Sequence, residues 1–107
     1  MLPKNKRLNL KKDFKWVVSG QKVESKFVTL FMRTGQNSFP LVGIASSSRH
    51  FKKATDRNRA KRVTSSVIEK LYSKLPSNIN IVVLPKLTIV GVKSQDVLSS
   101  MEEVLNL

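Results

Sequence analysis

The chain has 107 residues, 40% of them hydrophobic, with four glycines, four prolines and no cysteine. This composition indicates one globular domain and excludes disulfides, thiolate metal sites and thiol catalysis. The formal net charge is +13, and the segment 1–62 holds 16 of the 20 Lys and Arg residues but only three of the seven acids, so the excess lies upstream of Val63. Such self-repulsion favours a polyanionic partner, with nucleic acid first and an anionic membrane surface second.

A membrane location has little support in the sequence. No apolar run approaches the roughly 20 residues that span a bilayer, and the basic N-terminus lacks the apolar core of a signal peptide. We therefore expect a cytoplasmic protein that does not contact a membrane.

The N-terminal residues predict a basic arm followed by a short helix. Residues 1–9 are polar and basic and are expected to be extended. Apolar residues recur at helical spacing from Leu10, which predicts a helix over about 10–19. Asn9 is a suitable N-cap, and Gly20 a suitable residue just beyond the C-terminus of the helix.

A hairpin is predicted next. Residues 22–33 are rich in β-branched and aromatic side chains, residues 35–40 supply turn formers, and residues 41–47 predict a second strand, so we expect an antiparallel pair. Gly43 inside the second strand indicates close backbone approach or a bulge.

The longest helical pattern follows a very basic stretch at 51–62, which carries six basic side chains and one acid. Thr55 or Asp56 is expected to cap this helix, and Pro76 to end it.

The C-terminal part predicts a buried strand at 79–84 and an amphipathic helix that starts at Ser94. Residues 86–92 fit either a further strand or an irregular loop. The order α-β-β-α-β-α, with room for one extra strand, predicts a single α+β domain over residues 1–107 with helices packed on a small sheet.

A helical wheel shows how the side chains of the basic stretch are distributed around the predicted helix. Arg57, Lys61, Asn58 and Arg62 form one continuous polar face beside the apolar stripe, whereas Arg59 lies on the outer side. Cations at a helix N-terminus oppose the macrodipole, so a helix selected for stability alone would carry acids there. Free backbone N–H groups at that end and bidentate Arg side chains both suit phosphate. We therefore favour a nucleic-acid surface over a merely solvated face.

The aromatic, histidine and acidic residues give weaker evidence for a functional site. Phe14, Phe27 and Phe31 could stack on bases but are more typical of core residues, and Trp16, off the apolar stripe, is the better exposed aromatic. His50 is the only histidine, so it cannot anchor a metal site with other histidines or cysteines. The acids are too few and scattered for a two-metal nuclease. We expect no catalytic residues and no metal site in the protein itself.

Three segments together resemble the protein component of bacterial ribonuclease P. They are LPKNKRLNLKKDF (2–14), GIASSSRHFKKATDRNRAKR (43–62) and INIVVL (79–84). The most specific signal is the Arg-Asn-Arg-x-Lys-Arg start of a helix that follows a strand and a basic loop.

The resemblance implies a fold and a function. The fold would be a four-stranded sheet with a left-handed βαβ crossover, like that of the second domain of ribosomal protein S5. The protein would bind the catalytic RNA and the 5′ leader of precursor tRNA, and would assist Mg-dependent endonucleolytic removal of that leader. The Mg²⁺ would be held mainly by the RNA and the substrate phosphates.

The resemblance also assigns residues. The RNA-binding set is Arg49, Lys52, Lys53, Arg57, Asn58, Arg59, Lys61 and Arg62. The leader-binding cleft, between the first helix and the sheet, is assigned to Phe14, Val18, Phe27 and Leu30.

Two other functions fit the same charge and size. A small ribosomal protein would bind rRNA without any catalytic role, and it would not require this helix start. A stand-alone nuclease would cleave precursor tRNA without an RNA partner.

Overall fold

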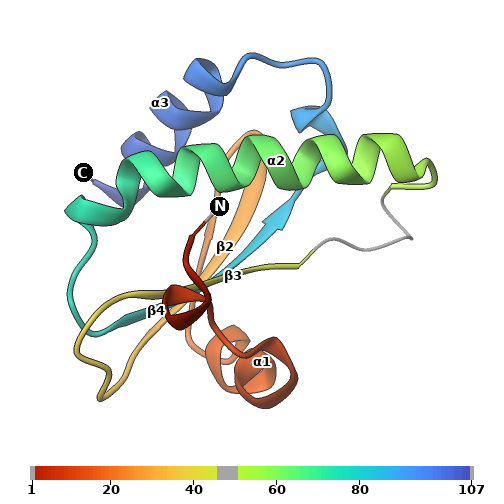
Figure 1. Cartoon of the computed structure of the whole chain (residues 1–107). Coiled ribbons are helices and arrows are strands. Elements are labelled where there is room, and N and C mark those ends of the chain that lie inside the picture. The colour runs from red at the N-terminus through yellow and green to blue at the C-terminus, as the bar shows by residue number, and fades with distance from the viewer. Residues whose placement is uncertain (1, 46–50, 107) are drawn as a thin grey trace.

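Four strands form one mixed sheet in the computed structural model, which describes residues 2–45 and 51–106 (Figure 1). The strand order is β1-β2-β4-β3, with β1 and β4 each antiparallel to β2 and with β3 parallel to β4. The strands are β1 (Gln21–Glu24), β2 (Val28–Thr34), β3 (Leu41–Ile44) and β4 (Ile79–Pro85). The α-helices are α1 (Leu10–Val18), α2 (Ala54–Leu71) and α3 (Ser94–Leu105), and the 3-10 turns are η1 (Lys4–Lys6), η2 (Tyr72–Lys74) and η3 (Leu87–Ile89).

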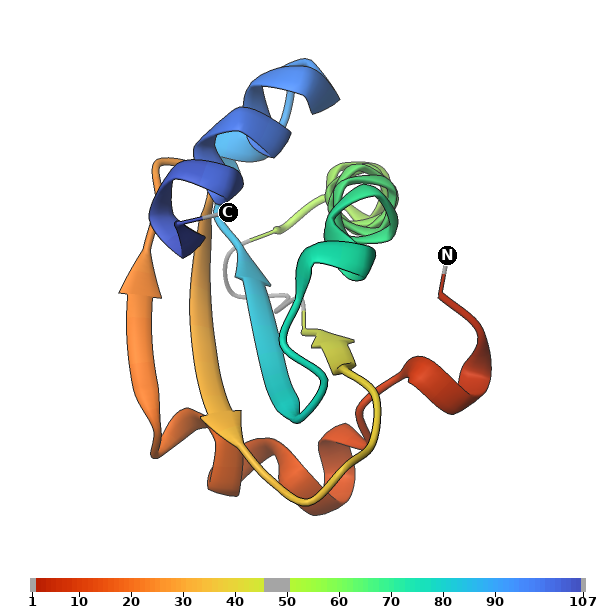
Figure 2. The ribbon, with the colours of Figure 1, turned by 90° about the vertical axis from the view of Figure 1, so that its left-hand side faces the viewer.

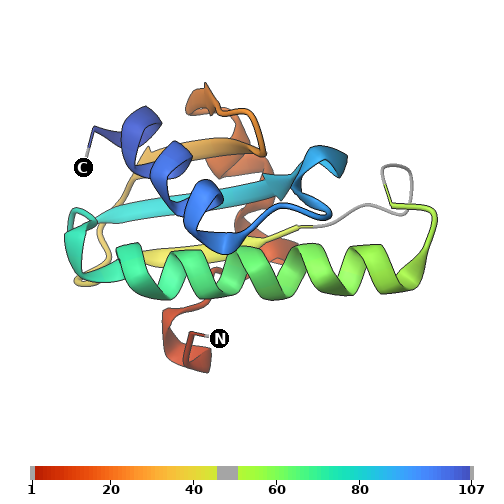
Figure 3. The same cartoon turned by 90° about the horizontal axis from the view of Figure 1, so that it is seen from above.

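The helices cover the two faces of the sheet unequally. α2 and α3 lie side by side on one face, and α1 packs on the other (Figures 1 and 2). Seen from above, α2 links the parallel strands β3 and β4 by running back over one face of the sheet, and this β3-α2-β4 connection is left-handed (Figure 3). Parallel crossovers are right-handed in about 98% of cases, so this topology is unusual. The predicted α+β fold with a four-stranded sheet and a left-handed crossover is confirmed.

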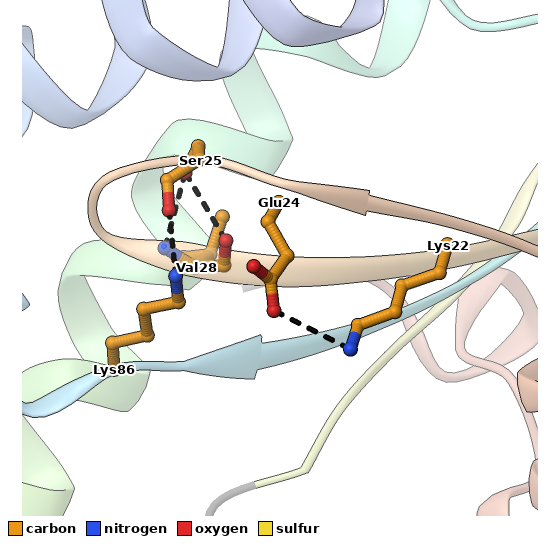
Figure 4. Close-up of polar contacts among 5 residues, drawn as sticks. All are labelled: Lys22, Glu24, Ser25, Val28 and Lys86. Carbon is orange, nitrogen blue, oxygen red and sulfur yellow. Dashed lines mark hydrogen bonds and ion pairs between the residues drawn. The ribbon is translucent and has the colours of Figure 1, made fainter.

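The prediction of one strand over 22–33 is wrong, because the chain reverses at residues 25–27 to form the β1–β2 hairpin. Ser25 makes the turn: its hydroxyl accepts from the backbone N–H groups of Phe27 (3.3 Å) and Val28 (3.1 Å). Lys86 Nζ donates to the Ser25 carbonyl at 2.9 Å (Figure 4). The nearby Lys22–Glu24 pair (3.4 Å) is exposed and contributes little.

The predicted pairing of 22–33 with 41–47 is also wrong. β3 pairs with β4, with Val42 opposite Ile81, because α2 carries the chain back over the sheet and delivers β4 between β2 and β3. Strand pairing is a long-range outcome that local turn signals do not determine.

β4 is an inner strand, between β2 and β3, and its sequence reflects this position. Ile81, Val82 and Val83 are all buried. Ile81 and Val83 belong to the main core under α2 and α3, whereas Val82 belongs to a smaller cluster under α1. Burial on both faces explains why the strand has a nearly continuous apolar run rather than an alternating one.

The expectations for α1 are confirmed. The helix begins after Asn9, whose side chain accepts from the Lys12 N–H at 3.4 Å. Gly43 provides close approach between β3 and this helix, since a Cβ added there would lie 2.7 Å from Leu10 Cδ2. Of the two alternatives for residues 86–92, the structure has the irregular loop, which contains η3, rather than a further strand. α3 begins at Ser94 as predicted.

The cap predicted for α2 is wrong. The helix begins at Ala54, so Thr55 and Asp56 already lie within its first turn, and the N-cap is Lys53, which makes no side-chain capping bond. The apolar stripe of α2 is buried as predicted, but Thr64 and Ser65 are buried beside it. None of the helices in the described part is both long and apolar enough to cross a bilayer.

Phe51 fixes the entry to α2, because it is only 1% exposed and packs in the main core. We expect Phe51→Ala to lower the free energy of unfolding by about 3–5 kcal/mol, the range for removing a buried Phe side chain. Urea unfolding measures this loss. Phe39→Ala is the matched control, because Phe39 is 38% exposed. Equal losses in the two variants would contradict this role of Phe51.

Candidate nucleic-acid interface

The basic surface is built where the chain leaves the core and enters α2. Phe51 is buried, and the chain next to it turns outward so that Lys52 and Lys53 are exposed. Lys53 is extended, with φ −93° and ψ 129°, and no described side chain caps the helix that follows. Backbone N–H groups at an uncapped helix start are suited to anionic oxygens.

Most of the predicted RNA-binding residues come together on the first turns of α2. Asn58, Lys61 and Arg62 line one open hollow of about 510 Å³ with Thr55. Arg57 is half-buried beside the apolar stripe, as the helical wheel predicts. Arg59 is exposed and does not line the hollow. Arg49 lies outside the described residues.

The positive charge of this face is not neutralised internally. Between described residues, Arg57, Lys61 and Arg62 form no ion pair, and the two pairs found are Lys22–Glu24 and Lys74–Glu102. One acid, Asp56, lies in the first turn of α2. The face therefore presents several cations with free hydrogen-bond donors, which is the chemistry that binds phosphate.

The predicted leader-binding cleft is only partly assembled. Phe14 and Val18 on α1 are half-buried. Phe27 and Leu30 are buried in the main core under α2 and α3, on the opposite face of the sheet. Their assignment to a cleft beside α1 is therefore wrong.

Phe31 is the β2 residue that joins Phe14 in the cluster under α1. Successive side chains of a strand point to opposite faces, and Val28 and Leu30 are the buried ones. This alternation was the signal that could have selected Phe31 from the sequence.

Polar residues that sequence reasoning missed surround Trp16, the predicted exposed aromatic, at one end of α1. Trp16 is 39% exposed, and the Arg33 guanidinium lies 4.7 Å from the centre of its ring. Arg33 Nη1 also donates to the Trp16 carbonyl at 3.2 Å. With Asn37 and Asn80, Trp16 lines an open hollow of about 780 Å³. Asn80 is the one polar residue of β4, and its amide donates to the Arg33 carbonyl at 3.2 Å.

The N-terminal arm is not simply extended. It contains η1, and its backbone joins the edge of the sheet through an isolated parallel β-bridge between Arg7 and Val42. Lys6 Nζ lies 4.7 Å from the centre of the Tyr72 ring. The Tyr72 hydroxyl donates to the Pro40 carbonyl at 2.7 Å, and burial raises its pKa above the usual value. The expected extended arm is therefore corrected to a docked one.

The part of the chain that the structure describes does not gather metal-ligating side chains into one place. Within residues 2–45 and 51–106, no three His, Asp or Glu side chains gather into a group that could hold an ion.

Comparisons with known proteins agree with this architecture. The family model described as Ribonuclease P matches residues 2–107. The ribonuclease P protein component of Thermotoga petrophila is 33% identical over 85 residues, covering 78% of this chain and 71% of that protein. That of Nitrosococcus oceani is 38% identical over 52 residues, covering 48% of this chain and 44% of that protein.

Solved structures show the same fold. The ribonuclease P protein of Thermotoga maritima, in complex with 1-(4-fluorophenyl)-2-thiourea, has a TM-score of 0.81 at 24% identity and covers 92% of this chain and 96% of that one. A Staphylococcus aureus ribonuclease P protein mutant with defective mRNA degradation activity has a TM-score of 0.83 at 20% identity, covering 96% and 87%. With a family model matched along nearly the whole sequence, the chain belongs to the ribonuclease P protein family.

Proposed function

We propose that this protein binds the catalytic RNA of ribonuclease P and assists that RNA in removing the 5′ leader from precursor tRNA. The observation that carries the proposal is the gathering of Asn58, Lys61 and Arg62 around one hollow on the first turns of α2, where the N-cap residue Lys53 makes no side-chain capping bond. Lys52 and Lys53, exposed just before the helix, extend the cationic surface. A folded RNA offers phosphates at the density that such a surface can neutralise.

The protein's part in the reaction would be electrostatic and positional. Mg²⁺, which prefers phosphate and water oxygens, would be held by the RNA and the substrate and would promote hydrolysis of the phosphodiester bond. The cations on α2 would lower the repulsion between the RNA and its substrate. The protein would thereby reduce the Mg²⁺ concentration that the reaction requires.

The leader would lie on the α1 side of the sheet. Phe14 and Phe31 are both half-buried there, so part of each ring is available for stacking. Base–aromatic stacking contributes about 1–3 kcal/mol per base and tolerates any sequence. Lys22 Nζ lies 6.0 Å from the centre of the Phe31 ring, so a base stacked on that ring would have its neighbouring phosphate close to a cation.

Reconstitution tests the proposal directly. We expect this protein to stimulate cleavage of precursor tRNA by a bacterial ribonuclease P RNA at low Mg²⁺, and to do so less when the substrate leader is shortened. Cleavage by the purified protein without RNA would instead establish a stand-alone nuclease. Sedimentation with ribosomal subunits and no stimulation would establish a ribosomal protein.

The cationic face of α2 leads to a second prediction, which concerns the affinity for the catalytic RNA. Arg57→Ala and Arg62→Ala should each weaken binding to the catalytic RNA about tenfold or more, since hydrogen bonds to charged groups contribute about 1.5–3 kcal/mol. Lys4→Ala should have a smaller effect, because Lys4 lies in η1 and outside the hollow on α2. Filter binding at fixed salt measures all three. Equal losses would argue against a preformed site on α2.

A further inference from the structure

A second, smaller hollow lies next to the basic face, between the N-terminal arm, β3 and α2. Its volume is about 200 Å³. The residues that line it are Leu2, Arg7, Leu8, Leu10, Val42, Gly43, Ile44, Lys61, Ser65 and Ile68. The walls are therefore mostly aliphatic and come from elements that are far apart in sequence.

Ser65 is the unexplained group in this hollow. Ser65 is 6% exposed, and its side-chain hydroxyl is buried with no hydrogen-bond partner among the described residues. The neighbouring Thr64 is buried too, but its hydroxyl donates to the Ala60 carbonyl at 2.7 Å. A buried hydroxyl without a partner is costly and therefore uncommon in native proteins. Ser65 thus lines an aliphatic hollow with an unused donor and acceptor, which a rotation about its Cα–Cβ bond would turn toward that hollow.

Two cationic side chains, those of Lys61 and Arg7, also line this hollow. Lys61 lines it and also lines the larger hollow on the basic face, so the two hollows share this cationic side chain. Arg7 contributes a second positive charge from the arm, where its Nε donates to the Leu2 carbonyl at 2.9 Å. Lys61 forms no ion pair with any described residue. An anionic group attached to whatever enters the hollow would therefore meet a free ammonium.

We propose that this hollow takes the base of one unpaired nucleotide of the RNA held on the α2 face, a refinement that rests on the function proposed above. Leu10 and Ile68 supply apolar surface for the faces of the base. The Ser65 hydroxyl bonds to a polar atom on the edge of the base after its side chain rotates toward the hollow. Lys61 binds the phosphate of the same nucleotide. Proteins recognise RNA sequence chiefly through such unstacked bases, held by stacking and by hydrogen bonds to their edges.

The size of the hollow favours one base over larger ligands. Pockets for drug-sized molecules measure roughly 300–1,000 Å³, so about 200 Å³ suits a single ring system. A purely apolar ligand would leave Ser65 unsatisfied. A free phosphate would leave the aliphatic walls unused.

Titration with mononucleotides tests the site without the large RNA. The probes are uridine and adenosine 5′-monophosphate, with ribose 5-phosphate as the control that has the phosphate but no base. We expect the amide resonances of Gly43 and Ser65 to shift with at least one nucleotide at millimolar concentration and not with ribose 5-phosphate. Equal shifts with all three probes, or no shifts, would overturn the proposal.

Variants of Ser65 test the site in the protein–RNA complex. Ser65→Leu fills the hollow and removes the unpaired hydroxyl, so we expect thermal stability to be kept or raised while affinity for the catalytic RNA falls at least tenfold. Ser65→Ala removes only the hydroxyl, and we expect a loss of about 2–10-fold, equivalent to one hydrogen bond. Ser66→Leu is the matched control, because Ser66 is half-buried and does not line the hollow.

The two proposals fail in different ways. Full RNA affinity in both Ser65 variants, with weakened binding in Arg62→Ala, would overturn the nucleotide site and leave the function intact. Full RNA affinity in all three, together with no stimulation of cleavage, would overturn the proposed function itself.

Discussion

The repulsion among like charges at the start of α2 is the constraint on which the rest of this structure depends. Six basic residues fall within residues 51–62, and the helix dipole opposes those in the first turn. The core holds them there in spite of this. Phe51 anchors one end, and the buried stripe that begins at Ala60 anchors the helix itself. Burial of apolar surface thus supports a cationic face that would be unfavourable in an isolated helix.

The left-handed crossover determines what that face adjoins. α2 runs back over the sheet from the end of β3 to the start of β4, so its first turns lie beyond the end of β3 (Figure 3). The docked N-terminal arm lies along the free edge of the same strand, through the Leu8 N–H that donates to the Val42 carbonyl at 3.1 Å. The basic face, the arm and the small hollow beside Ser65 are therefore parts of one surface. The aromatic residues Phe14 and Phe31 lie on the opposite face of the sheet, so the strands separate them from the basic face.

Sequence reasoning predicted the elements better than their pairing. Local signals were enough for α1 with its Asn9 cap, for α3 and for the buried β4, because capping and apolar periodicity act within a few residues. They were not enough for the turn at Ser25, which depends on a serine hydroxyl and on Lys86 from a distant segment. The parallel partner of β3 is likewise a tertiary choice. The helical wheel placed Asn58, Lys61 and Arg62 together, whereas the cleft assignment failed at Leu30 because it ignored the two-residue alternation of a strand.

The salt dependence of RNA binding tests the central claim most directly. Neutralisation of about 6–10 phosphates predicts that the affinity for the catalytic RNA falls about 10³–10⁵-fold between 50 and 200 mM salt. The slope of log affinity against log salt should become shallower by about one phosphate contact when Arg62 is replaced by alanine. An affinity that hardly changes with salt, or a slope unaffected by this replacement, would contradict the account.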